Sequence, residues 1–178
     1  WGLLPIYWGL LHHISAYSVL AHRIIWSALF MSFVAIGLNY KQFKKDCLHL
    51  RQNISQVCLL FLASIFVSSN WGLYIWAISN NRVMDTSFGY YINPLLNVVL
   101  GVLVFKEKLT FPQWCSVGLA TIGIIFISLQ MGSTPDLALA IALTFGLYGL
   151  VKKKLLIHPF TSIAFEAWLV APLALAYT

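Results

Sequence analysis

The stretch SAYSVLAHRIIWSALFMSFVAIGL, residues 15–38, decides the fold class of this chain. Its apolar part is about 20 residues long, which is the length that an α-helix needs to cross roughly 30 Å of hydrocarbon. His22 and Arg23 nevertheless stand side by side within it. Because a charge buried in hydrocarbon is costly, this pair inside a spanning helix needs a physical explanation.

The composition favours a membrane protein over a soluble or nucleic-acid-binding one. The chain is 60% hydrophobic and 9% charged, whereas soluble domains are roughly 25% charged. Its net charge of +6 comes mainly from lysines at the ends of apolar runs, so we expect the lipid bilayer as a partner and no nucleic acid. The cysteines, Cys47, Cys58 and Cys115, have neither metal nor redox spacing. We therefore expect no metal and no cofactor.

Seven apolar segments predict an all-α polytopic membrane protein, folded as a helical bundle. They cover residues 1–11, 18–38, 55–77, 87–105, 112–130, 137–151 and 160–178. We expect the first and last to be partial, because the chain begins and ends inside them. Thr110, Pro112 and Gln113 predict the start of the fifth helix, with Thr110 as its N-cap.

The charges of the loops predict the orientation of these segments. Loops 39–54, 106–111 and 152–159 carry four, two and three Lys or Arg residues, whereas the alternate loops carry one, Arg82. Basic loops stay in the cytoplasm. We therefore expect these three loops to be cytoplasmic.

A weak internal similarity predicts a repeat. At an offset of 144 residues Ser18 aligns with Ser162 and His22 with Glu166. If the sixth segment repeats the first, the repeat unit has five helices, and an odd number of crossings turns the second copy upside down. Such inverted repeats are typical of secondary transporters. We expect a first repeat at 1–130 and the start of a second at 131–178.

Arg23 is the first candidate for a functional side chain. It lies about 8 Å below the outer interface if the helix starts near Tyr17. One interpretation is snorkelling, in which its long side chain reaches back to the lipid headgroups. The other is that it faces an internal cavity and binds an anionic group, since polar and aromatic residues share adjoining helix faces at i, i+4 spacing, His22 with Trp26 and Arg23 with Ser27.

The fourth segment is the most polar of the apolar runs. Tyr90, Asn93 and Asn97 fall on one helical face, and Pro94 frees the carbonyl of Tyr90 and predicts a kink. This face suits either substrate contact or hydrogen bonding between helices. In the third segment, Trp71 is either part of an interface belt or an inward-facing ring. The cavity candidates are His22, Arg23, Trp26, Trp71, Tyr90, Asn93 and Asn97.

Two glutamates and the proline complete the candidates. Glu107 follows the fourth segment between two lysines, and it is either a solvated loop charge or a gating residue. Glu166 lies about six residues inside the seventh segment. An intramembrane carboxylate is a functional candidate by default, so Glu166 is a candidate for coupling to protons. Pro94 is the gating candidate within the fourth helix.

The sequence offers no motif for an enzyme. It has no phosphate-binding loop, no HExxH and no GxSxG, so we expect no catalysis. Two classes remain: a secondary transporter, and a multi-helix membrane protein with a receptor-like or assembly role. Short loops and the inverted repeat favour the transporter.

Three motifs resemble a known family. AHRIIWS at 21–27, NWGLYIWA at 70–77 and GYYINPLLNVVLG at 89–101, followed by Glu107, are similar to the RarD-like permeases of the EamA branch of the drug/metabolite transporter superfamily. The resemblance covers nearly the whole chain. It implies ten helices in two inverted five-helix repeats, with both termini cytoplasmic.

The resemblance also implies a function. A RarD-like chain would be a permease that moves small metabolites or drugs across the bacterial inner membrane by alternating access. The partner would then be an unknown small-molecule substrate, and a homodimer is possible. Glu107 falls on a glutamate that recurs in the EamA branch, and His22 and Arg23 fall in its AHR motif.

Overall fold

The computed structural model describes residues 14–131 and 136–177, and these residues form helices joined by short turns. The helices are α2 (Ala16–Gln52), α3 (Ile54–Ser79), α4 (Val83–Phe105), α5 (Phe111–Met131), α6 (Asp136–Lys154) and α7 (Pro159–Tyr177). Five of them, all except α6, are long and apolar enough to cross a membrane. The prediction of an all-α polytopic bundle is therefore confirmed. The predicted segment 1–11 lies outside the described residues.

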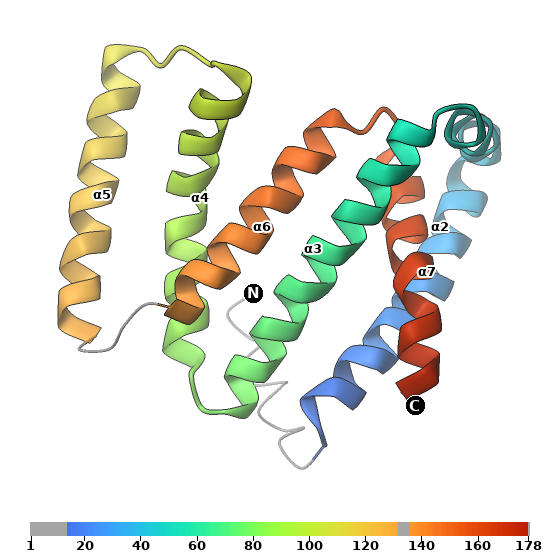
Figure 1. The fold of residues 1–178 in the computed structure, drawn as a ribbon, viewed down its shortest axis with the longest axis horizontal. Coiled ribbons are helices and arrows are strands. Elements are labelled where there is room, and N and C mark those ends of the chain that lie inside the picture. The colour runs from blue at the N-terminus through green and yellow to red at the C-terminus, as the bar shows by residue number, and fades with distance from the viewer. Residues whose placement is uncertain (1–13, 132–135, 178) are drawn as a thin grey trace.

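The helices form an open bundle with α6 near its centre (Figure 1). α2 packs along α7, and the two run in opposite directions; α6 packs against both α3 and α4. α5 packs on α4 at one edge, and its apolar side chains are largely exposed. The tightest part of the bundle is thus built from helices that are distant in sequence.

The prediction of a loop at residues 39–54 is wrong in one respect, because most of this segment is helical. α2 continues to Gln52, and the chain turns at the single residue Asn53, which ends α2 and begins α3. The segment 39–52 contains neither glycine nor proline, and its buried residues Asp46 and Leu50 are one helical turn apart. Charged residues mark the end of a membrane span, but they do not end a helix. Likewise, α6 was predicted to end at residue 151 but continues through its three lysines to Lys154.

Helix ends elsewhere follow local chemistry. Before α5, the Thr110 backbone N–H donates to Gln113 Oε1 at 2.7 Å, which is one half of a capping box and agrees with the predicted start. α3 ends in a turn at Asn81, which has a left-handed φ of 59°, and the next N–H, of Arg82, donates to the Ala77 carbonyl at 2.8 Å. α4 runs through Pro94 without ending.

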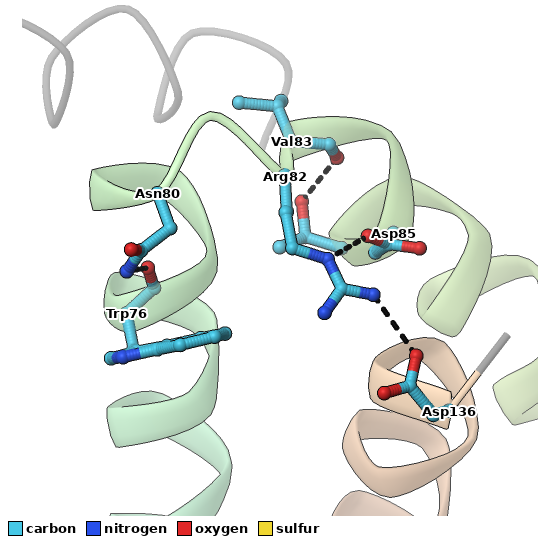
Figure 2. Close-up of polar contacts among 7 residues, drawn as sticks. Trp76, Asn80, Arg82, Val83, Asp85 and Asp136 are labelled. Carbon is cyan, nitrogen blue, oxygen red and sulfur yellow. Dashed lines mark hydrogen bonds and ion pairs between the residues drawn. The ribbon is translucent and has the colours of Figure 1, made fainter. Parts of the chain in front are cut away.

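Arg82 then joins this turn to α6 (Figure 2). Its Nε donates to Asp85 Oδ2 at 2.7 Å, and its second guanidinium nitrogen donates to Asp136 Oδ1 at 2.9 Å. At the other end of the same two helices, Glu107 pairs with Lys153. Ion pairs therefore hold α4 and α6 together at both ends.

Between these ends α4 and α6 approach closely through glycine. A Cβ on Gly89 would lie 3.0 Å from the Ala138 carbonyl oxygen and 3.1 Å from the Ile141 side chain. Asn70 of α3 adds a polar contact, since its buried amide donates to the Ile141 carbonyl at 2.8 Å. Small residues and interhelical hydrogen bonds are the usual means by which membrane helices associate. α6 is therefore held by close packing against α4 and by a hydrogen bond from α3.

Candidate functional site

A cavity of about 310 Å³ lies between α2, α3, α6 and α7. Volumes of this size suit a small organic ligand. Its apolar wall comes from residues such as Leu20, Ile24, Val67 and Ile163. The charged and aromatic lining residues are Arg23, Trp71, Phe145, Tyr148 and Glu166.

Arg23 lies on the α2 wall of this cavity. Its guanidinium carbon is 3.2 Å from the centroid of the Trp71 ring, which is well within the range of a cation–π contact. Stacking uses the flat face of the guanidinium, whereas its N–H donors radiate in the plane of the group. The arrangement therefore fixes the direction of the donors and suits them to bind the oxygen atoms of an anion such as a carboxylate or sulfonate.

Glu166 lies on the α7 wall and is 3% exposed. Its Oε1 accepts from Lys152 Nζ at 2.9 Å and from the Ser162 hydroxyl, and its Oε2 accepts from the Tyr148 hydroxyl at 3.0 Å. Lys152 reaches this carboxylate from the last turn of α6. Buried carboxylates are tolerated when they are paired and hydrogen-bonded in this way.

A run of aromatic rings connects the two charged walls. Ring centroids lie 5.7 Å apart for Trp71 and Tyr74, 5.9 Å for Tyr74 and Tyr90, 6.4 Å for Tyr90 and Phe145, and 5.9 Å for Phe145 and Tyr148. Such separations are typical of favourable edge-to-face and tilted pairs. Tyr90 does not line the cavity, but its ring makes edge-to-face contacts with Tyr74 and with the lining residue Phe145.

The structure thus places Arg23, Trp71 and Glu166 on the wall of one cavity, with Tyr90 in contact with the lining residue Phe145. Two neighbours in the AHR motif lie elsewhere. His22 is exposed, and its Nδ1 is 2.9 Å from the Ser18 carbonyl oxygen. Trp26 is 68% exposed on the outer surface of α2.

Like Tyr90, the other predicted residues of α4 do not line the large cavity. Asn93 is buried, and its Oδ1 accepts no hydrogen bond within the described part of the chain. Asn97 faces α6, where its Oδ1 would lie 3.5 Å from a Cβ on Gly146. Pro94 is exposed. The wall expected from the fourth helix is instead supplied by α6 and α7.

Asn97 and Glu107 share a smaller pocket of about 240 Å³ at the far end of α4 and α6. Glu107 pairs there with Lys153, whose ammonium also lies 4.2 Å from the Phe105 ring centroid. Glu107 is therefore more than a solvated loop charge, because its ion pair links the end of α4 to Lys153 of α6.

The sequence reasoning missed Lys152, Tyr148, Ser162 and Phe145. A signal existed for Ser162, which the offset of 144 residues aligns with Ser18. No sequence signal singled out Lys152, because it belongs to a run of three lysines that has the composition expected of a cytoplasmic loop. Within residues 14–131 and 136–177, no group of three or more His, Cys, Asp or Glu side chains could hold a metal ion.

Comparison with known proteins gives the family. The chain is 44% identical to the uncharacterized transporter YojE of Bacillus subtilis and 34% identical to the protein RarD of Escherichia coli, over 99% of this chain and 59% of each relative. It is 40% identical to the uncharacterized transporter PA0485 of Pseudomonas aeruginosa over 99% of this chain and 58% of that relative. The chain therefore spans less than two thirds of the length of these relatives.

No solved structure matches the chain significantly. The relatives named above bear out the resemblance to RarD-like proteins. Residues 1–129 match the family described as EamA-like transporters. Since that match covers most of the 178 residues, this chain belongs to the EamA-like transporter family.

Proposed function

We propose that this chain is part of a secondary transporter, a permease that carries a small organic anion, a metabolite or a drug, across a bacterial inner membrane. Membership of the EamA-like transporter family and the transporter names of the relatives support the general class. The cavity and its charges support the class of substrate. This assignment is a transport function and involves no catalysis.

One observation carries the proposal: the guanidinium of Arg23 is stacked on Trp71 at the wall of a cavity inside the bundle. A snorkelling arginine would instead direct its head towards the lipid headgroups. Held against the ring, Arg23 presents donors that match a carboxylate or sulfonate. The apolar and aromatic lining suits the remainder of an amphipathic anion.

The depth of the cavity supports alternating access. Arg23 lies seven residues after the start of α2 and Glu166 seven residues after the start of α7, so each is about 10 Å along its helix. The two helices run in opposite directions (Figure 1), and the cavity lined by both residues lies about 10 Å from the first residue of each helix. Substrate sites of transporters built from inverted repeats lie near this depth.

The same proposal includes the topology. Residues 1–130 would form the first five-helix repeat and 131–178 the start of the second, and the lysine-rich segments within 39–54, 106–111 and 152–159 would face the cytoplasm. Antiparallel packing of α2 on α7 is what an inverted repeat requires of equivalent helices. A homodimer stays a prediction.

The test uses the full-length protein reconstituted in liposomes. Uptake of labelled benzenesulfonate and cyclohexanesulfonate, which stay ionised and cross lipid poorly, is compared with that of the cation benzyltrimethylammonium. We expect the anions to be transported and the cation not, and Arg23→Ala to lower the apparent affinity for the anions about 10- to 100-fold.

Arg51→Gln is the matched control, because it removes the same charge from the exposed cytoplasmic end of the same helix. It should leave uptake unchanged. Equal uptake of the anions by wild type and Arg23→Ala, or preference for the cation, would overturn the proposal.

A further inference from the structure

We propose that Ser27 of α2 and Ser68 of α3 act as a hydroxyl pair that selects anions carrying a hydroxyl group of their own. Both serines line the large cavity, together with Arg23 and Trp71. The substrate class is then a cyclic organic acid with a hydroxyl group across the ring from its acid group. This inference rests on the proposed transport of an anion and adds the feature by which one anion is preferred over another.

The stack of Arg23 on Trp71 places the two serines at one level of the cavity. The guanidinium carbon lies 3.2 Å from the ring centroid, and α2 and α3 run in opposite directions (Figure 1). Ser27 follows Arg23 by four residues. Ser68 precedes Trp71 by three residues. Both serines therefore lie on the same side of the stack, about one helical turn, or 5–6 Å, away from it.

The hydroxyl groups of this pair are not bonded to their own helices. Ser32 of α2 and Ser64 of α3 each donate to the carbonyl four residues earlier, at 2.6 Å and 2.8 Å, which is a common way for a helix to satisfy a hydroxyl group. Among the residues that the structure describes, Ser27 and Ser68 have no such bond, and both side chains are half-buried. Their hydroxyl groups can therefore bind a ligand in the cavity.

The position of the pair suits the far end of a ligand whose acid group is bound at Arg23. One helical turn, about 5–6 Å, is close to the span between opposite substituents of a six-membered ring. Ile24 and Val67 line the same cavity and offer the ring an apolar surface. A serine hydroxyl both donates and accepts hydrogen bonds, and a ligand hydroxyl does so too. A methyl group in its place would leave the hydroxyl pair without a partner.

The opposite wall of the cavity is engaged with its own partners. The Glu166 carboxylate accepts from Lys152 Nζ at 2.9 Å, from the Tyr148 hydroxyl at 3.0 Å and from the Ser162 hydroxyl. A ligand hydroxyl that bound there would have to displace one of these donors. We therefore expect it to bind at Ser27 and Ser68.

Calorimetry with the full-length protein in nanodiscs tests this selection. The ligands are 4-hydroxybenzenesulfonate and 4-methylbenzenesulfonate, which have the same charge and nearly the same size. Titrations at pH 6 keep the phenol un-ionised, since phenols ionise near pH 10. We expect the wild type to bind the hydroxylated anion about 3- to 30-fold more tightly, the gain from one or two hydrogen bonds. 2-Hydroxybenzenesulfonate, whose hydroxyl group lies beside the acid group, should not show this gain.

The variants assign the preference to the two serines. Ser27→Ala and Ser68→Ala should each lower the preference about 2- to 10-fold, and the double variant should remove it. All three should still bind 4-methylbenzenesulfonate, because its acid group is held at Arg23. Ser64→Ala is the matched control on α3, since its hydroxyl group is already bonded and does not line the cavity. It should keep the wild-type preference.

The outcomes separate this inference from the proposed function. If the wild type binds both para-substituted anions equally and this binding depends on Arg23, the anion transporter stands and the hydroxyl selection is overturned. A preference that survives in the double variant, or that Ser64→Ala removes equally, also overturns the selection. If the double variant does not fold, the single variants decide in the same way. Absence of binding of every anion overturns the proposed function as well.

Discussion

Arg23 and Glu166 face one cavity from antiparallel helices, each seven residues after the first residue of its helix. The two side chains reach it by different means. Arg23 stacks on Trp71 of α3, whereas Glu166 is held by the hydroxyl groups and the ammonium of α6 and α7. The cavity therefore has a cationic wall and a wall whose charge is balanced.

Trp71 should be needed to orient Arg23. We expect Trp71→Leu to weaken binding of benzenesulfonate about 3- to 30-fold, which is the range of one cation–π contact, and Trp71→Phe to restore part of the loss. Fluorescence or calorimetric titration measures both variants. Trp76→Leu is the control, because Trp76 is 38% exposed and does not line the cavity. Equal affinities for Trp71→Leu and Trp76→Leu would contradict the proposed orientation.

Arg82→Gln should destabilise the protein most near neutral pH. Asp85 is buried, with Oδ1 accepting no hydrogen bond from the described residues, so loss of Arg82 removes its charged partner. The Arg82 hydrogen bond also lowers the pKa of Asp136. That stabilisation exists above the unfolded pKa of about 3.9 and is lost as the pH falls through the lower folded value.

Thermal unfolding in nanodiscs checks this pH dependence. We expect Arg82→Gln to lower the Tm by about 2–4 °C at pH 7, and the difference from the wild type to shrink below about pH 4. Arg51→Gln, which alters an exposed charge at the end of α2, should not change the Tm. A difference that stays constant down to pH 3 would show that the ion pairs contribute little.

Gln56 should hold the connection between α6 and α7. Its Oε1 accepts from the Leu156 N–H at 2.9 Å, and its Nε2 donates to the Lys154 carbonyl at 3.4 Å. We expect Gln56→Ala to cost about 1–2 kcal/mol and to speed proteolysis after Lys154. Gln52→Ala, at the exposed end of α2, should change neither. Unchanged cleavage would mean that other contacts hold this connection.

Gly89 should be required for the close approach of α4 to α6. A methyl group there would meet the Ala138 carbonyl oxygen at 3.0 Å, so Gly89→Ala should destabilise by about 1–3 kcal/mol. Gly123→Ala on α5 is the control, since a Cβ there meets nothing within 4 Å. It should be neutral or stabilise by up to about 1 kcal/mol through helix propensity. Equal Tm values for the two variants would refute the close packing.

Part of the site follows from the sequence because membrane insertion constrains it strongly. Arg23 and Glu166 stand out since charge is rare within apolar runs, and both line the cavity. Asn93 and Asn97 on α4, and Trp26 on α2, have the helical spacing expected of a face that contacts substrate. None of the three lines the cavity. Helical periodicity assigns residues to faces of one helix, but it does not say which neighbour covers each face.

The sequence by itself predicted the helices, most of their limits and two charges inside apolar runs, because the cost of polar groups in hydrocarbon acts on each segment separately. The tertiary structure decided which helices meet. Packing of α2 on α7 and of α6 on α3 placed Arg23 against Trp71 and brought Lys152 to Glu166. These contacts depend on small residues and on buried hydrogen bonds between helices distant in the chain, and no local pattern records such pairings.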